Sequence, residues 1–159
     1  MMNLTQGAKI VEGLEPQATD ANPASAYVDV SNYHTVYVVA HVTKDNAALT
    51  SFALEQATSS AGAGNKVFAN TVPVWSNLNT GDGDTLVRQA NAINYALDNA
   101  DDGRGQIVVF QIDPSRMDIN NGFRWLRVQL AAGNADNLAS VVFYMVDARY
   151  KQATPPSAV

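Results

Sequence analysis

Cysteine is absent from the 159 residues of this chain, and histidine occurs only twice. The first absence excludes disulfides and thiolate metal sites, and the second leaves few imidazoles for metal binding or acid–base catalysis. Charged residues make up 16% of the chain, and its ten Lys and Arg are scattered among 15 Asp and Glu. A net charge of −5 without a basic cluster argues against a general nucleic-acid binder, which needs cations to displace the counterions of phosphates.

Long apolar runs are missing as well. No stretch approaches the roughly 20 apolar residues of a membrane-spanning helix, and the first ten residues lack the apolar core of a signal peptide. We therefore expect a soluble protein without a cleaved leader or a membrane partner. The length fits one domain that buries a core without disulfides or metals. We place this domain in residues 1–150 and interpret residues 151–159, with Pro155 and Pro156, as a flexible C-terminal tail or arm.

Short runs of β-branched and aromatic residues, separated by turn residues, are abundant in the chain and are typical of strands. The last quarter contains two such runs on either side of residues 131–137, and the second of them, residues 140–146, is apolar at odd and even positions. Residues 33–42 and 106–112 share this property. Because side chains alternate across a strand, these three runs are expected inside a sheet with both faces covered.

The remaining pattern completes an all-β fold. No segment of useful length shows apolar residues at three-and-four spacing, so we expect little helix. About eight strands at short intervals predict an antiparallel β-sandwich of the jelly-roll type. Pro16 is expected to break the ladder in a loop of residues 15–26, and Pro73 places its strand at an edge or a bulge. Further strands are expected in residues 8–14, 49–57, 67–68, 72–75, 85–89 and 92–97.

Three groups of residues resemble parts of metal or phosphate sites, and each has a simpler interpretation. His34 and His41 are an odd number of residues apart, so a regular strand places them on opposite faces and they do not share a metal. Residues 81–84 (GDGD) lack the spacing and closing Glu of an EF-hand, and we interpret them as a hairpin turn. Residues 62–66 (GAGNK) lack the following hydroxyl residue and helix of a phosphate-binding loop.

Catalytic side chains are equally hard to assemble. Asp98, Asp101 and Asp102 fall in one loop, whereas the two carboxylates of a glycosidase flank the bond that they cleave. No Ser sits in a nucleophile elbow with a His partner. Trp75 and Trp125 would form a sugar-stacking platform if exposed, although Trp in a β-sandwich is more often part of the core. We therefore predict a non-enzyme without catalytic, cofactor-binding or metal-binding residues and without a cofactor.

Six short segments, spread over nearly the whole chain, carry a resemblance to a known family. The segments are Asn3-Leu4, residues 8–11, 72–78, 84–89 and 108–114, and Arg149-Tyr150. In this order they resemble small proteins encoded beside the major capsid protein in tailed bacteriophages, which are virion structural components and in some cases decoration or cement proteins. The resemblance implies a protein made in the bacterial cytoplasm that binds the outside of the capsid shell. Its implied partners are the major capsid protein and further copies of itself, as a dimer or trimer, and it carries over no catalytic residue.

We expect from this a decoration or cement protein that stabilises the shell, with residues 1–6 and 152–159 as candidate arms that hold neighbouring subunits. One alternative is a carbohydrate-binding β-sandwich with Trp75, Trp125 and the Asn/Asp loops, favoured if a Trp is exposed beside polar loop residues. A second alternative is another virion component, such as a tail or head-fibre protein. An enzyme on a jelly-roll scaffold is a third, and it would need a histidine to converge with acidic side chains.

Overall fold

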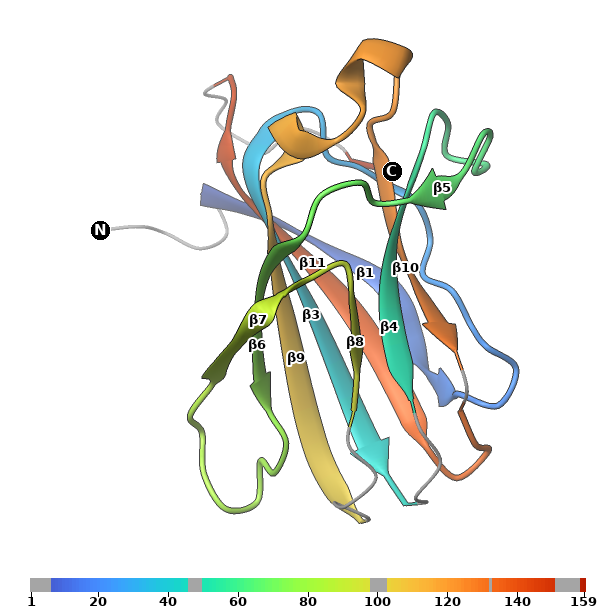
Figure 1. Ribbon diagram of the computed structural model, residues 1–159, viewed down its shortest axis with the longest axis vertical. Coiled ribbons are helices and arrows are strands. Elements are labelled where there is room, and N and C mark those ends of the chain that lie inside the picture. Colours follow the sequence, from blue (N-terminus) through green and yellow to red (C-terminus); the bar gives the residue numbers. More distant parts are fainter. Residues whose placement is uncertain (1–6, 46–49, 98–102, 132, 151–157) are drawn as a thin grey trace.

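The computed structural model describes residues 7–45, 50–97, 103–131, 133–150 and 158–159, which form two facing β-sheets. In Figure 1, β4, β8 and β10 lie in front of β3, β9 and β11. Two short 3-10 helices are the helical elements in the described part, where no helix has the length and apolar character needed to cross a membrane. The elements are β1 (Ala8–Ala18), β2 (Val28–Asp29), β3 (Tyr33–Lys44), β4 (Ser51–Ala57), β5 (Lys66–Val67), β6 (Val72–Asn77), β7 (Val87–Ala92), β8 (Asn94–Ala96), β9 (Arg104–Ile112), η1 (Pro114–Arg116), η2 (Ile119–Asn121), β10 (Trp125–Ala131) and β11 (Leu138–Ala148).

The strand order confirms the predicted all-β sandwich. One sheet has the order β1-β11-β3-β9-β6-β7 and the other β2-β10-β4-β5, with β8 paired to β4. The first strand pairs with the last, β2 with β10, β3 with β9 and β4 with β5, all antiparallel. Four such pairs wrapped into two sheets make the eight strands of a jelly roll. The described strands number eleven and not about eight, because β6, β7 and β8 are inserted between β5 and β9.

The core lies between the sheets and includes the inward side chains of the three doubly apolar strands. Val38, Phe110 and Phe143 are completely buried there. These strands, β3, β9 and β11, are adjacent in the middle of the six-stranded sheet, which confirms their predicted central position. The expectation that both of their faces are covered is wrong. Outward residues such as Val142 and Val109 are only half-buried, because the second sheet covers one face alone.

Two prolines lie at irregular positions of the ladders. The predicted loop from residue 15 is wrong in its first part, since β1 continues through Pro16 to Ala18 on the edge of its sheet. The register shifts between Leu14 and Gln17, so Pro16 sits in a bulge where no ladder hydrogen bond from its nitrogen is required. A second shift, between Val72 and Val74, confirms the bulge predicted at Pro73. The two-residue strand β2 was not predicted, because two residues show no alternation.

The two predicted arms fall largely outside the described residues, which do not include 1–6 or 151–157. The last two residues are described. Ala158 is completely buried, and its carbonyl accepts a hydrogen bond of 2.9 Å from the backbone N–H of Asp29 in β2. The end of the expected C-terminal arm therefore packs against the edge of the five-stranded sheet.

Candidate functional site

The two histidines do not converge with other ligands. His34 and His41 are both exposed on β3. Within the described ranges there is no group of three or more His, Cys, Asp or Glu arranged to hold a metal ion. The three aspartates considered as glycosidase carboxylates, Asp98, Asp101 and Asp102, lie outside those ranges.

The acidic GDGD sequence belongs to a hairpin loop, as interpreted. Residues 81–84 connect β6 to β7, which pair antiparallel. Asp82 lies 3.8 Å from the guanidinium of Arg104. The hydroxyl and the backbone N–H of Thr80 both donate to the carbonyl of Gly105, at 3.1 and 2.9 Å. These contacts fix the loop against the start of β9.

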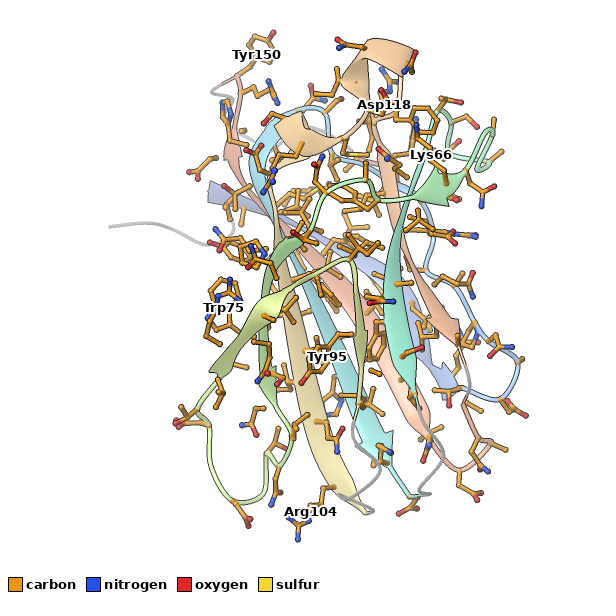
Figure 2. All side chains as sticks on the ribbon, viewed as in Figure 1. Lys66, Trp75, Tyr95, Arg104, Asp118 and Tyr150 are labelled. Atoms are coloured by element: carbon orange, nitrogen blue, oxygen red, sulfur yellow. The ribbon has the colours of Figure 1, made fainter. Side chains whose placement is uncertain are left out.

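Lys66, the last residue of the phosphate-loop-like sequence, holds the other end of the sandwich together. No helix follows it, since residues 66–67 form β5. Its ammonium lies 2.5 Å from the carboxylate of Asp118 and 4.1 Å from the ring centroid of Phe123, and Figure 2 shows Lys66 beside Asp118. The hydrogen bond from Lys66, followed by one from Asn121, lowers the pKa of the Asp118 carboxyl below its usual value. Lys66 thus fixes the segment that carries η2.

Neither tryptophan lies in the core, so that expectation is wrong. Trp75 is half-buried on the outer face of the six-stranded sheet, and Trp125 is half-buried on the outer face of the five-stranded sheet. The two indoles are on opposite sides of the sandwich and do not form one platform. The guanidinium of Arg88 lies 4.9 Å from the ring of Trp75, and that of Arg124 lies 5.9 Å from the ring of Trp125.

The outward-facing residues in the middle of four strands of the six-stranded sheet, β11, β3, β9 and β6, are uncharged. We call these outward-facing residues the neutral face, and they include no Asp, Glu, Lys or Arg. The neutral face consists of Ser140, Val142, Tyr144 and Val146 on β11, Thr35, Tyr37, Val39 and His41 on β3, Ile107, Val109 and Gln111 on β9, and Trp75 on β6.

Strand pairing places six outward-facing residues of this sheet in one row. In strand order the row is Glu12, Val142, Val39, Val109, Trp75 and Arg88. Glu12 on β1 and Arg88 on β7 are exposed, and neither forms a salt bridge with another described residue. The row therefore has an apolar middle and opposite charges at its two ends.

A hollow of about 510 Å³ lies on the neutral face. Val39, Ile107 and Val109 line its apolar floor, and Thr80 and Leu86 of the β6–β7 loop line one side. Thr80 forms a hydrogen bond with the carbonyl of Gly105 at the start of β9, and this bond holds that side of the hollow in place. Asp84 of the same loop also lines the hollow. The hollow is shallow and its floor is apolar, which suits contact with another apolar surface.

The outer face of the five-stranded sheet has a different character. Arg127 of β10 lies 2.7 Å from the carboxylate of Glu55 on β4, and its guanidinium is 4.8 Å from the ring of Tyr27. Ala53 is a half-buried, outward residue of the same surface. We call the outward side of β4 and β10 the charged face.

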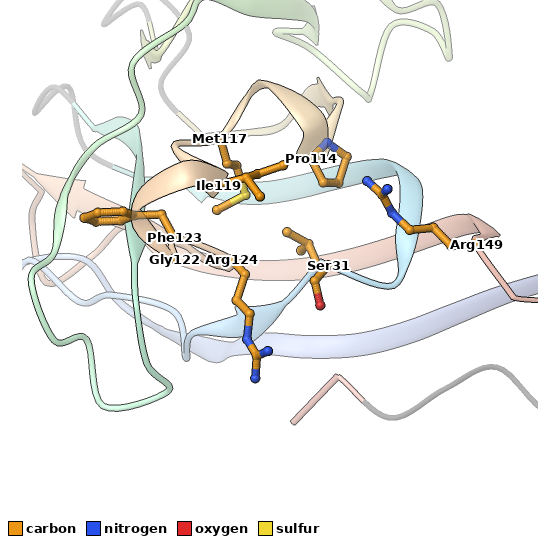
Figure 3. A pocket seen from close by; sticks show the side chains of 9 residues that line it. Ser31, Pro114, Met117, Ile119, Gly122, Phe123, Arg124 and Arg149 are labelled. Carbon is orange, nitrogen blue, oxygen red and sulfur yellow. The ribbon is translucent and has the colours of Figure 1, made fainter.

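A smaller pocket of about 200 Å³ opens at the end of the sandwich that carries the 3-10 helices. Figure 3 shows Pro114, Met117 and Ile119 together on one side of it, with Arg124 and Arg149 on its flanks. Arg124 already pairs with Asp29, at 3.2 Å. This pocket was not predicted, because its lining comes from segments that are far apart in the chain.

Comparison with protein-family models finds no match, and comparison with curated proteins finds none either. Three solved structures are similar over most of the chain. The SPBc2 prophage-derived protein YomS has a TM-score of 0.47 and 6% identity over 86% of this chain and 92% of its own. The Tobacco streak virus coat protein dimer has a TM-score of 0.40 and 9% identity, over 98% of this chain and 94% of its own. The CBM22-2 xylan-binding domain of Paenibacillus barcinonensis Xyn10C has a TM-score of 0.42 and 12% identity, over 91% of this chain and 93% of its own. None reaches a TM-score of 0.5, so none decides between functions.

Proposed function

We propose that this protein is a non-enzymatic structural component of a bacteriophage virion, which binds the outside of the capsid as a homo-oligomer and stabilises it. The observation that carries the proposal is the neutral face. A sandwich that leaves an uncharged face with half-buried valine and aromatic side chains uncovered over four strands suits contact with other protein, since open apolar surfaces mark interaction sites. The resemblance of six segments to capsid-associated phage proteins supports the same role.

The jelly roll supplies what such a role requires physically. A rigid scaffold loses little conformational entropy on binding, so more of its contact energy appears as affinity. A protein that binds the assembled shell in preference to free subunits lowers the free energy of the shell, and the effect is summed over many copies. Individually modest contacts therefore suffice, and no chemical step is needed.

The test uses phage particles with and without this protein. Particles that lack it are expected to assemble but to release their DNA at a lower temperature, and added full-length protein should restore their heat resistance. Its copy number in purified particles should be comparable to that of the major capsid protein. Equal heat resistance of stripped particles, or a few copies that copurify with tails alone, would contradict the proposal.

A carbohydrate-binding module is the second candidate, and the half-exposed Trp75 on the neutral face supports it. We place it second because the guanidinium of Arg88 lies over the ring on which a sugar would stack. Titration with xylan oligosaccharides, followed by Trp fluorescence, distinguishes the two candidates. Saturable quenching that disappears in Trp75→Phe and persists in Trp125→Phe would favour the glycan module.

A further inference from the structure

The neutral face lies on a chain whose net charge is −5. Two copies of an acidic protein repel each other through most of their surface, and like charges in direct contact are especially unfavourable. Contact between copies is least opposed where charge is missing. The charged residues of its four strands, Lys44, Arg104 and Asp147, lie at or near strand ends and outside the neutral face, so the neutral face meets this condition.

The outward side of the whole six-stranded sheet, which is the neutral face together with the flanking strands β1 and β7, is also large enough. Six strands at a spacing of about 4.8 Å and seven residues at about 3.3 Å each give a surface of roughly 24 by 23 Å, or about 550 Å² per copy. Two copies together then bury about 1,100 Å², above the roughly 1,000 Å² expected of a specific interface. Identical twisted sheets also pack face to face, with their strands nearly aligned.

We propose that two copies of this chain pair through their neutral faces, about a twofold axis that runs parallel to the strands between β3 and β9. This axis places β1 of one copy over β7 of the other, β11 over β6, and β3 over β9. In the central row, Glu12 then lies over Arg88 of the partner subunit, and Val39 lies over Val109 of the partner subunit. Each dimer contains the Glu12–Arg88 pair twice, as an isologous contact requires.

The opposite charges at the ends of the row select this axis. A twofold axis perpendicular to the strands would bring β1 over β1, so that two Glu12 carboxylates faced each other. The parallel axis instead pairs each carboxylate with a guanidinium that has no salt bridge within the described part of its own chain. Opposite charges at the rim of an apolar contact fix its register and orientation.

Exposed apolar side chains at the two sides of the face agree with this arrangement. Ile10 on β1 and Leu138 on β11 are 45% and 48% exposed. Leu86, beside the hollow near β7, is 42% exposed. The proposed axis brings the β1–β11 side of one copy over the β6–β7 side of the other, so that exposed apolar surface on both sides is covered. This dimer does not depend on the proposed binding to a capsid.

Exchanging the charges of Glu12 and Arg88 tests the contact, and the double variant is the control for the single ones. The chain of 17.0 kDa is expected to have twice this mass in sedimentation equilibrium at micromolar concentration. Glu12→Arg or Arg88→Glu alone should raise the dissociation constant about tenfold or more, since each places like charges together. The double variant, Glu12→Arg with Arg88→Glu, should restore the dimer. A mixture of the two single variants should form a heterodimer, because both of its rim pairs are again complementary.

A second pair of variants tests the face independently of the rim. Val109→Asp buries an unpaired carboxylate in the proposed contact and should weaken association about a hundredfold. Ala53→Asp, at a half-buried outward position on the charged face, is the matched control and should leave the dimer intact. Thermal unfolding of each variant shows that the monomer still folds.

Three results would overturn the dimer: a wild-type mass of one chain up to millimolar concentration, a double charge variant as dissociated as the single ones, or a dimer that persists in Val109→Asp. If wild-type protein is monomeric and Val109→Asp abolishes its binding to stripped shells, the shell occupies the neutral face. The dimer is then wrong while the proposed function stands. A dimer that forms as described but does not bind shells would retain this inference and remove the proposed function.

Discussion

The two outer faces of this sandwich are built on the same fold but differ in where their charges find partners. On the charged face, Arg127 pairs with Glu55 at 2.7 Å within the same chain. The outward residues of the neutral face carry no charge, and Glu12 and Arg88 at the ends of the central row are too far apart to meet. The charges of the Arg127–Glu55 pair on the charged face are therefore paired within the chain. The apolar side chains of the neutral face are not covered by any other described residues.

The difference follows from what each surface gains in water. The ion pair of Arg127 with Glu55 already matches the two charges within the chain, so the charged face gains little from a protein cover. Each Å² of apolar surface removed from water contributes about 25 cal/mol. Covering the valines of the central row and the aromatic rings of the neutral face with a partner therefore lowers the free energy. Because these side chains are uncharged, their burial does not carry the cost of burying a charge.

Phe110 and its neighbour Val109 give the largest contrast between the inside and the neutral face. Phe110 is completely buried between the sheets, and Phe110→Ala should lower the free energy of unfolding by about 3–5 kcal/mol through lost burial and a cavity. Val109→Ala, on the outer side of the same strand, should cost less than about 1 kcal/mol in the monomer. Urea denaturation in a Glu12→Arg background, at low protein concentration, measures both. Similar costs would mean that the faces of β9 are wrongly assigned.

A smaller contrast is expected on β11. The doubly apolar sequence predicted Val142 as a core residue, but Val141 is the one that is completely buried, and Val142 faces outward. Val141→Ala should cost about 2 kcal/mol of unfolding free energy, and Val142→Ala less than about 1 kcal/mol. Val142→Ala should instead weaken self-association. Equal losses of stability with no change in association would contradict the neutral face as a contact.

The contribution of the charged face to the free energy of unfolding should depend on salt concentration, and that of the core should not. Glu55→Gln removes one partner of the pair with Arg127, whose side chains are 17% and 23% exposed, and should cost about 1 kcal/mol at low salt. In 1 M NaCl, where the Debye length is about 3 Å, that cost should shrink, while the cost of Phe110→Ala should not. Glu15→Gln, on an exposed residue of β1, is the control and should have almost no effect. A salt-independent loss in Glu55→Gln would show that packing, and not charge, holds this face.

The smallest effect is expected from acid, at the end of the sandwich away from the β6–β7 loop. The hydrogen bond from Ser115 holds the pKa of Asp113 below its ordinary value of 3.8. The folded state therefore favours the charged carboxylate, and the stability that it contributes is full above pH 3.8 and is lost as the pH falls through the lowered pKa. Asp113→Asn should reduce the loss of stability between pH 5 and pH 2 in denaturation curves. An unchanged acid dependence would mean that Asp118 and other carboxylates account for it.

The sequence by itself determined the β content, the jelly-roll class and the identity of the central strands. These features depend on alternation and on β-branched and aromatic runs, which are local properties of the chain. The same reasoning placed the turn at residues 81–84 and the bulge at Pro73. It failed for the two-residue β2, which has no pattern, and for Trp75 and Trp125, because residue type alone does not say which face of a strand is turned inward.

The tertiary structure decided what the neutral face is. A strand that is apolar on both sides has the same sequence whether its second side is covered by another layer or left open, so residues 33–42, 106–112 and 140–146 did not predict an open face. The row from Glu12 to Arg88 depends on the register of six strands that are distant in sequence. Register is set by long-range pairing and by the packing of the opposite side against the core, and only the folded chain fixes both.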